Sequence, residues 1–176
     1  MRIRNQTGVG MMEVLVALLL LSLAVLGFAA LQLRAVEATA EGGNRIQAMN
    51  IARDLAEKIR MNSSNAALRV YQANLADEDK QSASVSSCYS GTCIPATKAA
   101  FDVNEAYLKA QSVGMVLNMM DCPGTANGRT CIYVAWNKTD ATDNTTSKDG
   151  QIACTESQNS TFSYQDNSTC VVMEAF

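Results

Sequence analysis

Residues 14–31 read VLVALLLLSLAVLGFAAL, an uncharged run whose single polar side chain is Ser22. At about 1.5 Å of rise per residue, a helix over this run approaches the thickness of the hydrocarbon core of a bilayer. One carboxylate, that of Glu13, stands directly before the run. A carboxylate entering a membrane segment is costly in free energy, so Glu13 is a candidate functional residue whose partner must be found.

The residues ahead of the run form a short basic leader, MRIRNQTG over residues 1–8, which ends in Gly8. An apolar helix follows at once, and Glu13 is the fifth residue after that glycine. This arrangement resembles the class III signal of type IV pilins and of the pseudopilins of type II secretion. Within it, residues 12–19, MEVLVALL, are most similar to the minor pilins of the PilV family and slightly less similar to minor pseudopilins.

The resemblance implies that the leader is removed. A bifunctional prepilin peptidase would cut between Gly8 and Val9 and methylate the new amine of Val9. Val9 stands where these families usually carry Phe, and Gly10 where they usually carry Ser or Thr, but the glycine and the glutamate of the motif are both present. The resemblance also implies that Glu13 acts in filament assembly. Its implied partner is the terminal amine of an adjacent subunit, with the amine of its own Val9 as the alternative.

Charge sets the expected topology and excludes one class of partner. The formal net charge is −3 and becomes −5 when the leader removes Arg2 and Arg4, so we expect no basic patch that could hold nucleic acid. The two leader arginines favour a cytoplasmic N-terminus, which places the chain beyond the apolar run in the periplasm. An ordinary secretory signal cut near residues 38–40, Ala-Thr-Ala, is the alternative, but it leaves Gly8 and Glu13 unexplained.

The six cysteines all follow the apolar run, on the side of the membrane predicted to be oxidising. An even count in that setting predicts disulfides, and none of the spacings is the C-x-x-C of redox motifs or zinc ribbons. Six cysteines formally allow fifteen pairings. Sequential pairing is favoured because short loops close at little entropic cost, and it gives Cys88–Cys93, Cys122–Cys131 and Cys154–Cys170.

The sequence offers no catalytic, cofactor-binding or metal-binding constellation. It has no histidine, which excludes imidazole-dependent nucleophilic catalysis and imidazole metal ligands. Two acidic stretches, residues 77–79 and 140–149, carry oxygen ligands without the spacing of an EF-hand and are interpreted as solvated loops. We therefore expect a protein that is not an enzyme and that uses no cofactor.

A helical pattern continues beyond the apolar run. Ile46, Met49, Ala52, Leu55 and Ile59 recur at steps of three or four residues, which predicts one shared buried face. Asp54 and Lys58 are four residues apart and favour a helix. We expect one long helix over residues 10–61 with a weak point or kink at Gly42-Gly43, and two helices joined at these glycines are the alternative.

The remaining chain predicts short helices followed by strands. Asp102 and Glu105 fit a capping box, which predicts a helix that starts at Asp102, continues to Met120 and stops at Cys122-Pro123-Gly124. Further expected elements are a short helix over 66–75, polar loops over 77–93 and 137–151, and strands over 132–136, 151–155, 161–164 and 170–176. The expected fold class is α+β and pilin-like, with a long N-terminal α-helix, membrane-spanning in its first half, packed on a small antiparallel β-sheet head.

These inferences divide the chain into a leader over 1–8, a transmembrane or filament-core helix over 9–33, its amphipathic continuation over 34–62 and a disulfide-stapled globular head over 63–176. The resemblance implies a minor pilin of type IV pilus assembly, located in the inner membrane with its head in the periplasm and in the pilus at the cell surface. Its expected partners are prepilin peptidase, other minor pilins and the major pilin, in a priming complex at the pilus tip.

Three other functions stay open at this point. The chain could be a minor pseudopilin of a type II secretion or DNA-uptake system. It could also be a plain bitopic envelope protein with a binding head, which processing at Gly8 would argue against. The third alternative is a membrane-anchored oxidoreductase that uses the cysteines, and this function requires an exposed thiol of low pKa.

Overall fold

The computed structural model describes residues 10–123, 125, 128–146, 148, 150–158 and 161–175. The predicted cleavage site between Gly8 and Val9 lies outside these residues. The chain divides into two compact units, one that ends at Gly43 and one that runs from Asn44 to Phe176. The second unit contains the globular head.

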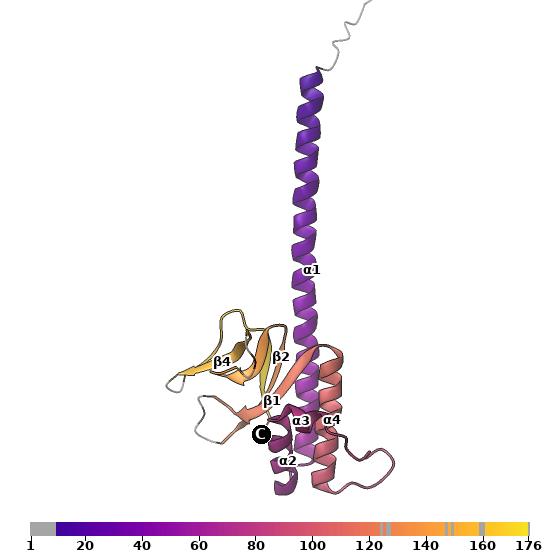
Figure 1. The fold of residues 1–176 in the computed structure, drawn as a ribbon, viewed down its shortest axis with the longest axis vertical. Coiled ribbons are helices and arrows are strands. Elements are labelled where there is room, and N and C mark those ends of the chain that lie inside the picture. Colours follow the sequence, from indigo (N-terminus) through magenta and orange to yellow (C-terminus); the bar gives the residue numbers. More distant parts are fainter. Residues whose placement is uncertain are drawn as a thin grey trace, which may run out of the picture. The chain divides into compact units, whose positions relative to one another are not determined.

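The longest element is the helix α1, Met11–Met61, which runs without interruption through Gly42 and Gly43 (Figure 1). The alternative of two helices joined at these glycines is therefore wrong. Leucine and alanine, which are good helix formers, dominate the first half of α1. Their helix propensity offsets the cost of about 1 kcal/mol that each glycine adds to helix formation. A Cβ atom built at either glycine would meet no atom within 4 Å, so no close packing requires a glycine there.

Within the second unit, α1 buries Ala48, Ala52, Leu55, Ala56 and Ile59. The expected face is therefore wrong at two positions, because Ile46 is 63% exposed and Met49 is 39% exposed. Three successive steps of three residues turn a helix by about 900°, which leaves Ile46 on the opposite side of the helix from Leu55. Burial instead follows the period of 3.6 residues, which steps from Ala48 to Ala52, Leu55 and Ile59.

Further helices of the head are α2, Asn65–Leu75, α3, Glu78–Ser82, and α4, Pro95–Ser112. Ser64 caps α2, since its hydroxyl accepts a hydrogen bond of 3.3 Å from the Ala67 amide. The helix expected over residues 66–75 is thus confirmed. The short helix α3 lies within the segment expected to be a polar loop, and the side chain of Asp77 caps its first turn.

The start and the end of α4 differ from the prediction. The helix begins at Pro95, whose missing amide is tolerated in a first turn, and Asp102 lies inside the helix with a buried side chain. α4 ends at Ser112, and Gly114 follows with a left-handed φ of 70° that favours glycine. The helix predicted to run from Asp102 to Met120 is therefore wrong at both ends.

Strand β1, Met115–Asp121, occupies part of the segment that was predicted to be helical. Residues 115, 117 and 119 are buried and alternate with less buried ones, which is the two-residue period of a strand. β1 pairs antiparallel with β2, Thr130–Trp136, and β2 pairs antiparallel with β6, Cys170–Glu174. The resulting β1-β2-β6 sheet is the small antiparallel sheet expected of the head.

A second sheet, with the order β3-β4-β5, was not predicted as a separate layer. Its strands are β3, Thr139–Asp143, β4, Ile152–Gln158, and β5, Thr161–Tyr164. β3 lies in the segment predicted to be a loop. It pairs parallel with β4, because β4 begins beside Thr139 at the start of β3, whereas β4 and β5 form an antiparallel pair. The expected antiparallel sheet therefore does not extend to the pair of β3 and β4.

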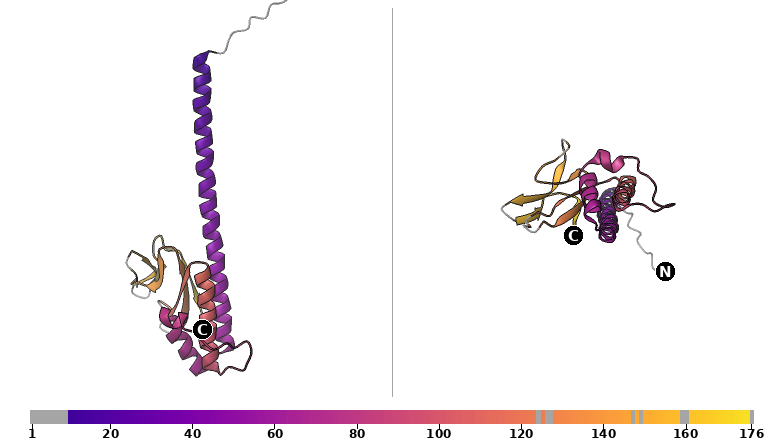
Figure 2. Two further views of the ribbon diagram at one scale, coloured as in Figure 1. Left: turned by 45° about the vertical axis from the view of Figure 1, so that its right-hand side comes forward. Right: turned by 90° about the horizontal axis from the view of Figure 1, so that it is seen from below.

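Strand β2 is buried on both faces and separates two clusters of core side chains. Ile132 and Val134 belong to the cluster shared with α1, α2 and α4, whereas Tyr133 and Ala135 belong to a cluster shared with Cys154 of the second sheet. The two views of Figure 2 show the strands gathered to one side of the helices of the head. The predicted pilin-like α+β fold, a long helix with an apolar first half and a small sheet in the head, is confirmed.

Candidate functional site

The first half of α1 presents an exposed apolar surface. Side chains that are at least half exposed are Leu15, Val16, Leu18, Leu19, Leu20, Leu21, Leu23, Val25, Leu26, Phe28 and Leu31. An 18-residue window of α1 has a mean hydropathy of 2.9, and none of this window is buried within the chain. By length and composition, α1 can cross a bilayer. Contact of this surface with water is unfavourable, so it requires lipid or other apolar helices around it.

The hydroxyl of Ser22 has its hydrogen-bond partner within the same helix. It donates a hydrogen bond of 2.8 Å to the carbonyl of Leu19, one turn earlier. A helix also pairs its own backbone groups, so the segment from Val14 to Leu31 suits a medium that offers no hydrogen-bond partners.

Glu13 lies in the first turn of α1, where its amide donates a hydrogen bond of 2.9 Å to the Gly10 carbonyl. Its side chain borders a shallow recess that also includes Ala17 and Leu21, four and eight residues further along the helix. A carboxylate at a helix N-terminus gains about 0.3–1 kcal/mol from the helix dipole. That gain is small, so a Glu13 carboxylate that is removed from water remains unfavourable unless a cation lies beside it.

The carboxylate of Glu13 forms no ion pair with any residue that the structure describes. The next basic residue along α1 is Arg34, about 30 Å away along the helix axis, and Arg34 pairs with Glu37 at 3.0 Å. A cationic partner for Glu13 must therefore come from the residues before it or from another molecule. Gly8 and Val9, the other residues of the motif, lie outside the described residues.

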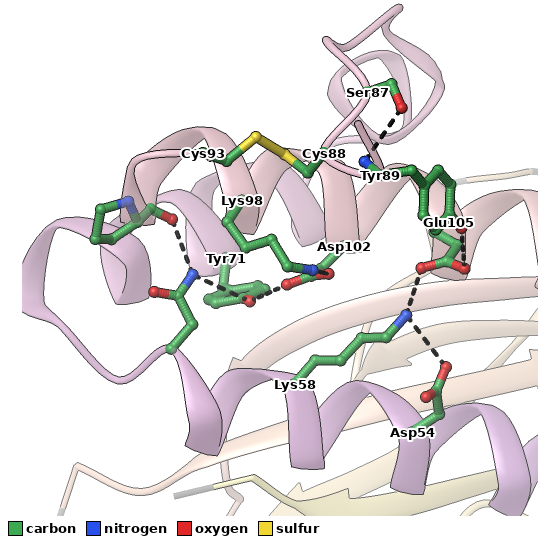
Figure 3. Close-up of polar contacts among 12 residues, drawn as sticks. Asp54, Lys58, Tyr71, Ser87, Cys88, Tyr89, Cys93, Lys98, Asp102 and Glu105 are labelled. Carbon is green, nitrogen blue, oxygen red and sulfur yellow. Dashed lines mark hydrogen bonds and ion pairs between the residues drawn. A yellow bond between two sulfur atoms is a disulfide. The ribbon is translucent and has the colours of Figure 1, made fainter. Parts of the chain in front are cut away.

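A buried polar cluster connects two helices of the head, α2 and α4 (Figure 3). Tyr71 of α2 donates a hydrogen bond of 2.7 Å to one carboxylate oxygen of Asp102 in α4, and the ammonium group of Lys98 contacts the other oxygen. Asp102 is 1% exposed. Burial, together with this hydrogen bond, raises the pKa of Tyr71 well above its usual value, so the phenol stays protonated as a donor.

A second, more exposed cluster surrounds Lys58 of α1. Its ammonium group lies 2.6 Å from Glu105 of α4 and 3.4 Å from Asp54, one turn earlier in α1 (Figure 3). Tyr89 donates a further hydrogen bond of 2.9 Å to Glu105. The hydrogen bond from Lys58 lowers the pKa of the Glu105 carboxyl to about 2. The helical Asp54–Lys58 contact expected from the sequence is confirmed.

Neither cluster was foreseen in full. Tyr71 and Asp102 are 31 residues apart, and Lys58 and Glu105 are 47 residues apart. Periodicity within one helix does not show which residues of another helix it faces. Because Asp102 was predicted to cap a helix, its burial inside α4 was not predicted.

All six cysteines form disulfides: Cys88–Cys93, Cys122–Cys131 and Cys154–Cys170. These are the pairs expected from sequential pairing. The third joins β4 to β6 and thereby connects the two sheets covalently. The first closes the loop that carries Tyr89, whose ring packs edge-on against Phe101 at 5.0 Å between centroids.

The two acidic stretches form no metal site in the described parts of the chain, where no three histidine, cysteine, aspartate or glutamate side chains gather closely enough to hold an ion. Asp77 instead caps α3 and pairs with Lys80 at 3.2 Å. Glu78 pairs with Lys148, also at 3.2 Å.

An exposed apolar helix with a glutamate in its first turn, followed by an α+β head, is consistent with the fold of a pilin. Residues 30–104 match the model of a protein family described as Tt1218-like, type IV pilin Tt1218. The match spans fewer than half of the 176 residues and includes neither Gly8 nor Glu13, so it supports a type IV pilin independently of the N-terminal motif. The matched family is structural rather than enzymatic, and the match does not single out PilV. No curated protein and no solved structure gives a significant match.

Proposed function

We propose that this chain is a minor pilin of the PilV type that takes part in the assembly of type IV pili. The observation that carries the proposal is the position of Glu13, at the edge of an exposed apolar helix and without a cationic partner among the described residues. An unpaired charge is strongly penalised where little water is present. A cation supplied by an adjacent subunit removes this penalty, which couples Glu13 to assembly.

The proposed path begins in the inner membrane. Residues 9–33 span the bilayer, the leader over residues 1–8 stays in the cytoplasm, and the head enters the periplasm. Prepilin peptidase cuts after Gly8 and methylates the amine of Val9. The resemblance of the motif around Gly8 and Glu13 to prepilin signals supports this step.

During assembly, the helices of neighbouring subunits then replace the lipid around α1. Lipid tails are as apolar as leucine, so helix association in the membrane depends on packing and on polar contacts rather than on the hydrophobic effect. The Glu13 carboxylate and the terminal amine of a neighbouring subunit provide such a contact and fix the axial position of one helix against the other. Residues 34–61 continue the helix, and the head over residues 63–176 is displayed outside the filament core.

The proposed partners are the major pilin and other minor pilins, in a priming complex at the pilus tip. The similarity of residues 12–19 to PilV supports a minor rather than a major subunit. The match of residues 30–104 to a type IV pilin family supports the general role.

The test is the intact mass of the chain from inner membranes and from sheared pili of the same cells. We expect both fractions to contain a chain that begins at Val9 with one added methyl group. A chain that begins at Met1 or near residue 41, or one that never appears in pili, contradicts the proposal. A deletion that abolishes secretion or DNA uptake while leaving pili intact would assign the chain to a pseudopilin system instead.

A further inference from the structure

One side of α1 within the head carries arginines that the head does not neutralise. Arg45, Arg53 and Arg60 are exposed, and their spacings of eight and seven residues place them within about 80° of one another around the helix. We call these three residues the arginine face. At about 100° per residue, Arg53 and Arg60 lie about 110–130° around the helix from the middle of the buried stripe at Ala52 and Leu55, whereas Arg45 lies about 50° from it.

The lysines of the head differ from these arginines in that most of them form ion pairs. Those that form ion pairs with carboxylates are Lys58, Lys80, Lys98, Lys109 and Lys148. In the described parts of the chain, neither Arg53 nor Arg60 forms an ion pair, and Arg60 donates from its Nε to the Ala175 carbonyl at 3.4 Å. The sequence has more acids than bases, so the free charge of the arginine face does not result from a lack of carboxylates in the chain.

Apolar side chains accompany these charges. Ile46 and Met49 are exposed, and the helical period places them on or beside the arginine face. Arginine and methionine are enriched at protein–protein interfaces, where the planar guanidinium group binds a carboxylate through two hydrogen bonds. Glu57 at the border of the face would repel a uniformly acidic surface, which favours a partner with carboxylates at defined positions.

We infer that the arginine face is a docking surface for a carboxylate-bearing face of a neighbouring pilin subunit. The inference rests on the proposed function, because it requires incorporation into a filament. Charge complementarity argues for an acidic partner, and the apolar Ile46 and Met49 argue for a protein. A nucleic acid is disfavoured, since a chain of net charge −3 with three separated arginines cannot neutralise a row of phosphates.

The first test compares incorporation of full-length variants into sheared pili with their abundance in the membrane. The double variant Arg53→Glu with Arg60→Glu places like charges in the contact and is expected to lower the ratio by about tenfold. The double variant Arg53→Lys with Arg60→Lys keeps the charge but loses the paired hydrogen bonds of the guanidinium group, so it is expected to lower the ratio by only about threefold. Arg69→Glu reverses an exposed arginine of α2 and is the matched control, with no expected change.

The second test identifies the partner chemistry directly. Sheared pili that contain the Arg53→Lys variant are treated with a carbodiimide, which activates a carboxylate that the new amine attacks to form an amide while a urea leaves. We expect mass spectrometry to find this amide between position 53 and an aspartate or glutamate of an adjacent pilin subunit. An incorporated Arg53→Lys variant without such a cross-link contradicts the inference.

The outcomes also separate this inference from the proposed function. If wild-type chain enters pili and the charge-reversal variant enters equally well, the docking surface is wrong and the minor-pilin role stands. If wild-type chain never enters pili, both are wrong. Should the reversal variant lose its disulfides and misfold, the cross-linking result decides.

Discussion

The hydroxyl of Tyr71 lies 2.7 Å from a carboxylate oxygen of Asp102, and both side chains are buried where α2 meets α4. Asn62, which follows α1, donates a hydrogen bond of 2.8 Å to the carbonyl of Pro95 and lies 3.5 Å from the same hydroxyl. The buried carboxylate of Asp102 thus links α2 to α4, and Asn62 links the residue after α1 to the start of α4.

Tyr71→Phe is expected to lower the free energy of unfolding by about 1–3 kcal/mol, because it removes a donor from a buried carboxylate and keeps the ring in the core. Chemical unfolding of the full chain in detergent, followed by circular dichroism, measures the loss. The control is Tyr107→Phe, whose hydroxyl accepts a hydrogen bond of 3.1 Å from Gln111 at the surface, with an expected change below about 0.5 kcal/mol. Equal stability of the two variants would show that the Tyr71–Asp102 bond is unimportant.

The second prediction concerns acid stability. Lys58 holds the pKa of Glu105 at about 2, below its ordinary value of 4.5. A carboxyl whose pKa is lower in the folded state stabilises the fold fully above the unfolded-state pKa, and this stabilisation is lost as the pH falls from about 4.5 towards 2. Glu105→Gln should therefore lower Tm at neutral pH and lose less Tm than wild type between about pH 5 and pH 2.

Thermal unfolding across this range, with the exposed Asp166→Asn as control, checks the prediction. Other paired carboxylates such as Asp54 contribute to acid unfolding in both chains, so the difference between the curves isolates Glu105. Parallel curves for wild type and Glu105→Gln would contradict the assignment.

The third prediction concerns the free edge of β1. Gln81 of α3 is 3% exposed, and its amide donates hydrogen bonds of 2.7 Å to the Leu75 carbonyl and 3.0 Å to the Leu117 carbonyl. It thereby pairs one backbone acceptor of this edge strand, the Leu117 carbonyl. Gln81→Met is expected to cost about 1–3 kcal/mol and to increase self-association, measured by unfolding and by light scattering. Gln111→Met, at an exposed position, is the control, and equal behaviour of the two would exclude the role.

The fourth prediction ranks the disulfides. Cys154 and Cys170 are buried and join the two sheets, whereas Cys88 and Cys93 close a short surface loop. Replacing both Cys154 and Cys170 by alanine should cost about 2–5 kcal/mol, and replacing Cys88 and Cys93 should cost less, because a shorter loop restricts the unfolded chain less. Peptide mapping without reduction should find all three sequential pairs in wild type. A different pairing, or the reverse order of costs, contradicts this ranking.

The spacing of apolar residues predicts those helices and strands in which one spacing repeats over many residues. The apolar run and the spacing of Ala52, Leu55 and Ile59 predict α1, and the alternation around Ile132 and Val134 predicts β2. The same reasoning failed over residues 113–120, because Val113, Leu117 and Met120 fit a helical spacing while Met115, Leu117 and Met119 fit a strand. Gly114, in its left-handed conformation, separates the two elements, and a glycine at this position is a turn signal.

Features that depend on contacts between distant residues could not be read from the sequence. The parallel pairing of β3 with β4 depends on where the chain returns after Asp143, which the composition of the loop does not specify. The burial of Asp102 depends on Tyr71 of another helix. Glu13, by contrast, was found from the sequence because an isolated carboxylate beside 18 uncharged residues is conspicuous by itself.

The assembly role of Glu13 is tested most directly by the amount of Glu13→Val chain in sheared pili, relative to the amount in membranes of the same cells. The matched control is Glu37→Val, which removes an exposed carboxylate from the same helix. The account predicts that both variants insert into the membrane and are cleaved at Gly8, that Glu37→Val enters pili like wild type, and that Glu13→Val is depleted by about tenfold or more. Equal incorporation of Glu13→Val and wild type would contradict the role assigned to this carboxylate.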